Sequence, residues 1–376
     1  MSNAESPGSC DWTTRLPPEI LAEIFLTSLA NAGDSNSDML SRNPPWLLSQ
    51  VCGRWRVVAL STPELWYSLF PFADSPLPVS SILALASAHI ERSNPLPLKL
   101  RVDSDWWFSN RPLLDLLLSP SQRARWGEVQ ILRAREDDAR SQSILVALRS
   151  NTFTCLKTLQ LENCDFTGEP SRIVFPMLTS LTLVSCCTPL LKTLSTPLLS
   201  RLEVEFTKLY RGNGHRTSAS ADLVAFIQKY ASSLVRLTLN NSRIEDRDLA
   251  GLLEKLPILT DLDVSDTITE VSTLLSDALL HGLRSRTHGP CVLPQLHTLS
   301  IMFVALPAST TSLLLDVLES RCHASETCGP LRSVRLCPYA SFKPQTTRRL
   351  KALAETGMNI AAFVLASGRW VQVELK

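Results

Sequence analysis

The sequence contains little glycine. Its 376 residues include only 13 glycines, about half the usual share, which leaves few positions for a glycine-rich loop that could hold phosphate groups. The segment GNGHRT (212–217) has the first two glycines of a dinucleotide-binding loop, but threonine stands where the third belongs. We therefore expect this segment to be a surface loop, and we expect no bound cofactor.

An excess of charge is also missing. Lys+Arg 37 against Asp+Glu 36 gives a net charge of +1. Proteins that bind nucleic acids or membrane surfaces normally carry a strong basic excess, so the balance argues against both kinds of partner. The uncharged, apolar-looking stretch 75–90 contains two prolines and is too short and too polar to span a bilayer.

The N-terminal residues MSNAESPGSCDW have neither the basic region nor the apolar core of a signal peptide. We therefore expect a cytoplasmic and/or nuclear protein. In those compartments its ten cysteines would be reduced thiols, many of them buried as small apolar side chains.

Motifs that carry catalytic chemistry are absent as well. No C-x-x-C spacing offers a local zinc or redox site, and the adjacent Cys322 and His323 have no nucleophile signature around them. We expect no metal site and no enzyme. A hydrolase that brings a Cys and a His together through the fold is the remaining enzymatic alternative, and one hyper-reactive cysteine would indicate it.

Leucine, by contrast, occurs 66 times. Many leucines follow a six-residue template, L-x-x-L-x-L, in which the last two apolar residues lie on a short strand and the first anchors it. Anchors recur at distances of 21 to 37 residues, which bracket the usual length of a leucine-rich repeat. Eight segments fit: WGEVQI (126–131), LKTLQL (156–161), LTSLTL (178–183), LSRLEV (199–204), LVRLTL (234–239), LTDLDV (259–264), LHTLSI (296–301) and LRSVRL (331–336).

Helical patterns lie between these segments, over 221–234, 246–256, 272–283 and 309–321. One strand and one helix per unit, each burying its apolar face against its neighbours, is typical of a solenoid. The predicted fold class over 126–376 is therefore α/β, an irregular leucine-rich-repeat solenoid with a basic C-terminal cap. An ordinary α/β domain rich in leucine is the alternative.

The beginning of the chain reads differently. In RLPPEILAEIF (15–25) two prolines suit a helix start, and Ile20, Leu21, Ile24 and Phe25 recur at helical spacing to make one apolar stripe. A polar loop over 30–45 and a single second helix over WLLSQVCGRWRVVALS (46–61) are expected to follow. With TPELW (62–66) they would form a small helical module over 15–66, carrying more apolar surface than it can hide.

Two further segments complete the predicted organisation. Residues 1–14 are expected to be a flexible tail, and residues 67–125 a connecting segment. Within that segment we expect a helix over 80–91 and a strand over 98–103.

In order and residue type, LPPEILAEIF, VCGRWRVVA and PELW resemble an F-box, in particular the F-box-like modules of fungal proteins. The whole chain resembles an F-box/leucine-rich-repeat protein. In that family the F-box binds the Skp-type adaptor of a cullin-based ubiquitin ligase, and the repeats capture a protein substrate. The resemblance implies that the adaptor-binding residues are Leu16, Pro17, Ile20, Leu21, Ile24, Phe25, Val51, Cys52, Trp55, Leu65 and Trp66.

Two alternatives stand beside this interpretation. The apolar stripe could pack onto the second helix and the first repeat as a cap, because solenoids need capped ends. The chain would then be a leucine-rich interaction scaffold without ligase docking.

Strand periodicity predicts where a substrate would bind. Side chains alternate along a strand, so residues flanking the inward leucines lie on the opposite face. Charged residues concentrate in three central repeats, and a mixed-charge centre could recognise a charged peptide of an unknown protein substrate; ordinary solvation of a strand face is the alternative. The candidates are Arg201, Glu203, Glu205, Arg236, Thr238, Asn240, Asp261 and Asp263.

Overall fold

The computed structural model describes sixteen segments of the chain, and within them the protein is α/β, with 13 α-helices and a 12-stranded, mostly parallel sheet. The chain divides into two compact units: one comprises 1–130 and 152–156, and the other 131–151 and 157–376. The predicted tail and most of the GNGHRT loop lie outside the described residues. These are 16–31, 44–69, 78–103, 111–134, 142–150, 153–164, 172–186, 189–206, 216–242, 244–266, 277–284, 291–303, 306–323, 328–338, 342–366 and 369–373.

The first unit begins with three helices that pack against one another, α1 (Pro18–Asn31), α2 (Pro44–Val51) and α3 (Gly53–Leu60). We call these helices, with the short 3-10 turn η2 (Pro63–Leu65), the head. The helix predicted over 80–91 and the strand predicted over 98–103 are confirmed. The remaining elements are β1 (Ser68–Leu69), α4 (Val79–Arg92), β2 (Leu98–Asp103), α6 (Arg111–Leu117), α7 (Pro120–Arg123) and the start of β3 (Trp126–Leu132).

The single second helix predicted over 46–61 is wrong at its centre. Between α2 and α3 the backbone of Cys52 is extended, with φ −156° and ψ 171°. Its sulfur accepts a hydrogen bond from the backbone N–H of Trp55 at 3.5 Å, so Cys52 caps the N-terminus of α3. The break changes which side chains of the second helix face inward.

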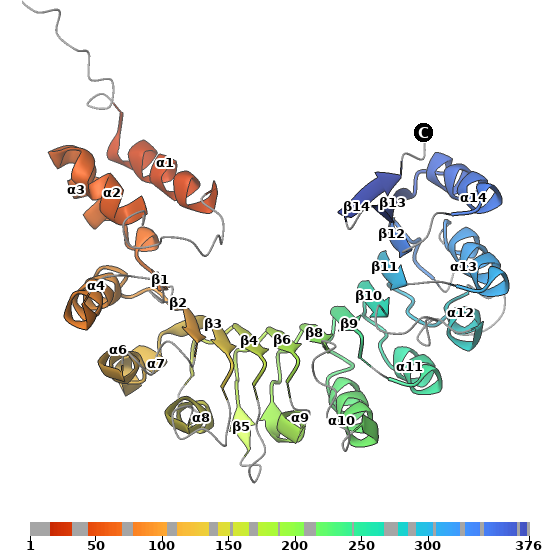
Figure 1. The fold of residues 1–376 in the computed structure, drawn as a ribbon, viewed down its shortest axis with the longest axis horizontal. Coiled ribbons are helices and arrows are strands. Elements are labelled where there is room, and N and C mark those ends of the chain that lie inside the picture. Colours follow the sequence, from red (N-terminus) through yellow and green to blue (C-terminus); the bar gives the residue numbers. More distant parts are fainter. Residues whose placement is uncertain are drawn as a thin grey trace, which may run out of the picture. The chain divides into compact units, whose positions relative to one another are not determined.

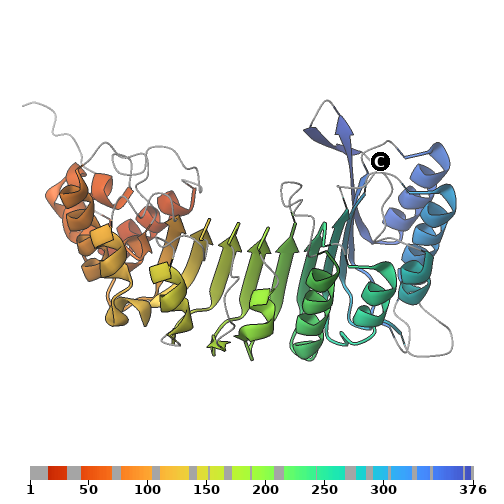
Figure 2. The same ribbon diagram turned by 60° about the horizontal axis from the view of Figure 1, so that its bottom comes forward.

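The second unit alternates strands and helices. Figure 1 shows its helices along one face of its sheet, and Figure 2 shows its central strands running side by side in one direction. The elements are α8 (Gln142–Arg149), β4 (Thr158–Glu162), β5 (Ile173–Val174), β6 (Ser180–Val184), α9 (Pro189–Thr193), β7 (Leu194–Ser195), β8 (Arg201–Glu205), α10 (Arg216–Lys229), β9 (Arg236–Asn240), α11 (Asp246–Leu253), β10 (Asp261–Asp266), α12 (Asp277–Leu283), β11 (Thr298–Phe303), α13 (Ala308–Ser320), β12 (Ser333–Pro338), α14 (Pro344–Glu355), β13 (Asn359–Ala366) and β14 (Arg369–Val373).

All seven template segments from residue 156 onward form strands, and successive strands pair in parallel with their template positions opposite one another. The last template position is buried in every one of them, because the helices cover that face of the sheet. This row consists of Leu161, Leu183, Val204, Leu239, Val264, Ile301 and Leu336. The helix predicted over 221–234 lies five residues earlier, as α10.

A left-handed backbone residue follows four of the strands, always seven positions after the first template residue. Each of these residues donates its backbone N–H to a carbonyl at the end of the next strand, at 2.7 or 2.8 Å. The hydrogen-bond ladder therefore continues one step beyond each strand. The residues are Arg133 (φ 57°), Asn163 (φ 53°), Ser185 (φ 51°) and Asn241 (φ 54°).

The cysteines follow the sequence prediction only in part. Cys164 and Cys186 are buried thiols that donate hydrogen bonds to the carbonyls of Ile131 and Leu161, at 3.5 and 3.1 Å. The prediction of reduced thiols is wrong for Cys291 and Cys328, which form a disulfide. Their Cα atoms lie 5.9 Å apart, because the loops that carry them precede neighbouring strands, β11 and β12.

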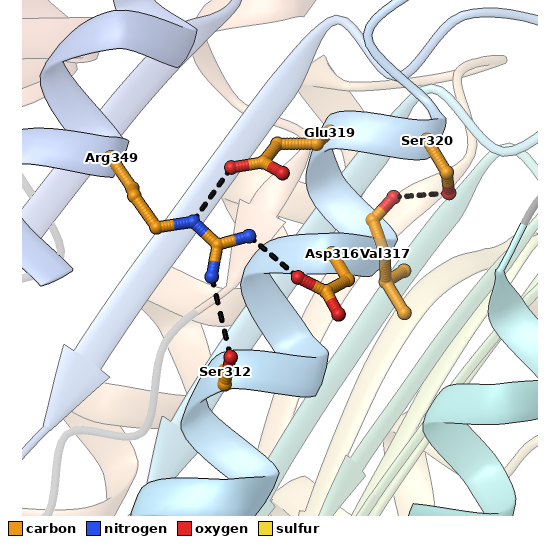
Figure 3. A network of polar contacts seen from close by, with 6 residues as sticks. All are labelled: Ser312, Asp316, Val317, Glu319, Ser320 and Arg349. Carbon is orange, nitrogen blue, oxygen red and sulfur yellow. Dashed lines mark hydrogen bonds and ion pairs between the residues drawn. The ribbon is translucent and has the colours of Figure 1, made fainter.

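The last two helices of the chain are held together by an arginine. Arg349 of α14 donates to Glu319 at 2.7 Å, to Asp316 at 2.6 Å and to Ser312 at 3.4 Å, all on α13 (Figure 3). None of the described helices is long and apolar enough to cross a membrane.

Candidate interaction surfaces

The apolar stripe of α1 is divided between two environments. Leu21 and Phe25 are fully buried in the core of the head, whereas Ile20 and Ile24 are 48% and 44% exposed. One helical position corresponds to a rotation of about 100°, so the two pairs cannot face the same side. The stripe therefore packs inward with one edge and presents the other edge to solvent.

Several predicted adaptor-binding residues lie in the core of the head. Leu21, Phe25, Leu65 and Trp66 are buried together, and their role as adaptor contacts stays a prediction. The indole N–H of Trp66 donates to the carbonyl of Ala59 at 2.7 Å, which fixes the end of the module onto α3. These side chains are large and apolar, and a three-helix head of this size needs them to form its core.

The other predicted residues lie at or near the surface. Trp55 is half-buried, with its ring centroid 4.9 Å from that of Phe25, and Cys52 is the half-buried cap of α3. Leu16 is half-buried and its carbonyl accepts a hydrogen bond from the guanidinium of Arg54. Pro17, Ile20, Ile24 and Val51 are exposed.

Each helix of the head presents one exposed apolar pair at helical spacing. We call these six side chains the exposed head residues: Ile20 and Ile24 on α1, Leu47 and Val51 on α2, and Val57 and Leu60 on α3. Sequence reasoning did not identify Leu47, Val57 or Leu60 as exposed candidates. The break at Cys52 resets the helical phase, and a cysteine followed by a glycine was the available signal for it.

An aromatic cluster joins α2, η2 and α4 inside the first unit. His89 of α4 is buried against the rings of Trp46 and Trp66, which also contact each other, and the guanidinium of Arg92 is 4.5 Å from the centroid of each indole. Burial lowers the pKa of His89 to about 4, and the charge of Arg92 acts in the same direction. The cluster fixes the helices that carry the exposed head residues.

The predicted substrate-face residues all lie on three neighbouring strands of the second unit, β8, β9 and β10. Strand register places them in three rows across the sheet, in which Arg201, Arg236 and Asp261 are paired, as are Glu203, Thr238 and Asp263. Arg236 and Asp261 form an ion pair at 3.3 Å. Asn240 and Glu205 are paired in the third row.

Two carboxylates at this centre have raised pKa values, mainly because they are partly buried. Partial burial raises the pKa of Glu203, and the nearby charges of Glu205 and Asp263 raise it further; a hydrogen bond from the hydroxyl of Thr182 opposes them. Burial likewise raises the pKa of Asp263, against a hydrogen bond from Ser300 and the charge of Arg335.

Three polar residues of this face were missed by sequence reasoning. Thr182, Ser300 and Arg335 continue the row of Glu203 and Asp263 onto β6, β11 and β12. They occupy the same template offset in their own segments. That offset was the signal that could have identified them.

No family model matches this chain. A search among curated proteins also found no match.

No group of three or more His, Cys, Asp or Glu side chains among the described residues is placed to hold a metal ion. Cys322 ends its helix with its thiol donating to the carbonyl of Glu319 at 3.0 Å, and His323 is exposed. What the geometry offers is a set of exposed apolar side chains in the first unit and a charged, helix-free sheet face in the second.

Proposed function

We propose that this chain is the substrate-recognition adaptor of a cullin-based (SCF-type) ubiquitin ligase, acting in the cytoplasm and/or nucleus. Its head is an F-box-like module that docks the Skp-type adaptor and, through it, a cullin. Its second unit belongs to a leucine-rich-repeat solenoid that binds the protein substrate. The observation that carries the proposal is the exposure of apolar pairs on all three helices of the head.

These side chains have no structural reason to face water. Removing a half-exposed Ile, Leu or Val from water contributes roughly 1 kcal/mol, so six contribute about 6 kcal/mol before the cost of association. A micromolar complex requires a net binding free energy of about 8 kcal/mol. The exposed head residues would therefore supply a large share of a docking interaction, with polar contacts at its rim supplying the rest.

The solenoid assignment is supported by the in-register parallel strands, the buried apolar rows and the left-handed residue that recurs seven positions after the template start. The substrate assignment is supported by the carboxylates of Glu203, Glu205 and Asp263 on the helix-free face. A charged segment of a protein substrate fits this face by charge complementarity.

One observation favours a second candidate, a leucine-rich scaffold without ligase docking. Leu21, Phe25, Leu65 and Trp66, four of the residues that match the F-box, form the core of the head. The resemblance could therefore reflect the packing of a small helical module alone. The same experiment separates the two candidates.

The test is a binding measurement between the full-length chain and a purified Skp-type adaptor. The informative variant is Ile20→Asp/Ile24→Asp, because both side chains are exposed and a charge there does not enter the core. Phe25 is unsuitable, because an aspartate at a fully buried position would unfold the head. The matched control is Val146→Asp, which places the same charge at an apolar residue of α8 that is 63% exposed.

We expect the wild type and the control to bind, and the double variant to lose at least about tenfold in affinity while keeping its circular-dichroism spectrum and melting temperature. If the folded wild type does not bind the adaptor, the ligase proposal is wrong and the scaffold remains. If the control loses binding as well, the effect does not come from the head.

A further inference from the structure

A buried arginine lies at the end of α13. Arg321 is 1% exposed and follows the last residue of that helix. Its Nε donates to the carbonyl of Leu283 at 2.8 Å and its Nη1 to that of Leu293 at 2.9 Å. Its Nη2 donates to the carbonyl of Val292 and lies 3.2 Å from Sγ of Cys291.

The described contacts of this guanidinium contain no carboxylate. Burial lowers the pKa of Arg321 to about 10, the direction expected for a cation without a compensating charge. A buried charge without a countercharge is costly even when its hydrogen bonds are satisfied. Of the groups that contact it, the sulfur of Cys291 is the one that can become an anion, by opening of the disulfide to a thiolate.

The two cysteines are not equivalent. Cys291 is half-buried, whereas Cys328 is fully buried. A small oxidant therefore meets the sulfur of Cys291 first, and Cys328 is already placed to react with it from inside.

The loops that carry these cysteines are held together by the backbone as well. The N–H of Gly329 donates to the carbonyl of Pro294 at 2.7 Å, and that of Leu331 donates to the carbonyl of Arg321 at 2.8 Å. These bonds do not involve sulfur. The two thiols would consequently stay close after the disulfide is reduced.

We propose that Cys291 and Cys328 are a reversible oxidation site, in which Arg321 holds Cys291 as the reactive thiolate and Cys328 is the resolving thiol. The oxidant is a hydroperoxide, with hydrogen peroxide as the simplest case. This inference does not depend on the ligase proposal.

The reaction has two steps. The Cys291 thiolate attacks one oxygen of hydrogen peroxide, the S–O bond forms, the O–O bond breaks, and the departing hydroxide takes a proton to become water. The Cys328 sulfur then attacks the sulfenic sulfur, the S–S bond forms, the S–O bond breaks, and a second water leaves with the thiol proton. Two thiols are oxidised to one disulfide while one peroxide is reduced to two waters.

The first experiment measures thiol reactivity. The full-length protein is reduced, freed of reductant and treated briefly with isotopically labelled iodoacetamide, and each cysteine is quantified by peptide mass spectrometry. Cys155 and Cys322 serve as internal controls, because both are half-buried like Cys291 and neither has a described contact with an arginine. We expect Cys291 to react at least about tenfold faster than either.

The second experiment assigns the roles with hydrogen peroxide. In Cys328→Ser, Arg321 and Cys291 are untouched, so a sulfenic acid should accumulate at Cys291 and be trapped by dimedone. In Cys291→Ser, Cys328 should show little trapping. The wild type should instead form the Cys291–Cys328 disulfide, and Cys155→Ser should behave as the wild type does.

Loss of the cation is tested with Arg321→Met, with folding checked by circular dichroism. In a folded variant the alkylation rate of Cys291 should fall to that of Cys155. If this variant does not fold, the alkylation rates of the wild type and the hydrogen peroxide experiment still test the proposal. Equal alkylation rates for Cys291 and the control thiols, or sulfenic acid appearing first at Cys328, would overturn the proposal.

Discussion

Trp46 donates its indole N–H to Nε2 of His89 at 2.9 Å, while Nδ1 of the same ring lies 3.3 Å from the carbonyl oxygen of Trp66. An indole nitrogen can only donate and a carbonyl can only accept. His89 therefore has its proton on Nδ1, and it is neutral. Protonation of Nε2 would place two donors against each other inside a buried aromatic cluster.

The first prediction is a loss of stability in acid. Because the pKa of His89 is about 4 in the folded protein and about 6.5 in the unfolded chain, the unfolded state binds more protons between these values. Stability contributed by neutral His89 is present above pH 6.5 and is lost as the pH falls toward 4, by about 3 kcal/mol in total. Urea unfolding followed by tryptophan fluorescence at pH 7.5, 6, 5 and 4.5 measures this loss in the free energy of unfolding.

His89→Phe is the matched variant for this test. It leaves the N–H of Trp46 and the carbonyl of Trp66 unpaired, so it should cost about 1–3 kcal/mol at pH 7.5. It should also change less in stability between pH 6.5 and 4.5 than the wild type does. An equal pH dependence in the two proteins would contradict the assignment.

The second prediction concerns the Arg349 bridge of Figure 3. Arg349→Ala should lower the protection of amide hydrogens in α13 and α14 against exchange, by roughly 1 kcal/mol, because it breaks contacts to both Asp316 and Glu319. The effect should shrink at high salt. Arg348→Ala is the control, since that neighbouring side chain is exposed, and equal exchange in both variants would mean that the bridge contributes nothing.

The third prediction concerns the left-handed residues. Asn163 has φ 53° and an exposed side chain, so Asn163→Val forces a β-branched residue into a disfavoured backbone region. The expected loss is about 1–2 kcal/mol. Asn163→Gly, which tolerates this φ, should stay within about 0.5 kcal/mol of the wild type in urea unfolding. Similar losses for both variants would point to the asparagine side chain instead of the backbone.

The fourth prediction follows from the cap of α3. A thiol accepts hydrogen bonds weakly, so Cys52→Ser should raise stability by about 0.5–1 kcal/mol and Cys52→Ala should lower it. Urea unfolding followed by tryptophan fluorescence gives the order of stability of the wild type and the two variants. An alanine variant as stable as the serine variant would show that the cap contributes nothing.

Elements with a strong apolar period were predictable from the sequence. Strands β4, β6, β8, β9, β10, β11 and β12 fall on the template segments, and the predicted helix over 80–91 lies inside α4, because each buries residues at a fixed spacing. Elements with short or mixed patterns were not predicted. The two-residue strands β5 and β7, the helix α9 and the strand β13 are specified by tertiary contacts that no local period records.

The candidate surfaces were predictable to different degrees. The substrate-face residues could be placed because alternation along a strand and a shared template fix both their face and their row. The exposed head residues could not be placed in this way, because one extended residue, Cys52, separates two helices whose phases differ. Leu21 and Ile20 are both apolar neighbours on one helix, and only packing against α3 decides which of them is buried.

The template anchors are 21 to 37 residues apart in the sequence, yet the seven template strands β4, β6, β8, β9, β10, β11 and β12 stay in register. All variation in length is therefore confined to the segments between the strands. Neighbouring strands of the sheet lie about 4.8 Å apart, and this spacing does not depend on the length of the segments that connect them. Glu203 and Asp263, with only β9 between their strands, stand about 10 Å apart on the sheet face. Under the proposed function, a substrate segment with positive charges about 10 Å apart would match that interval.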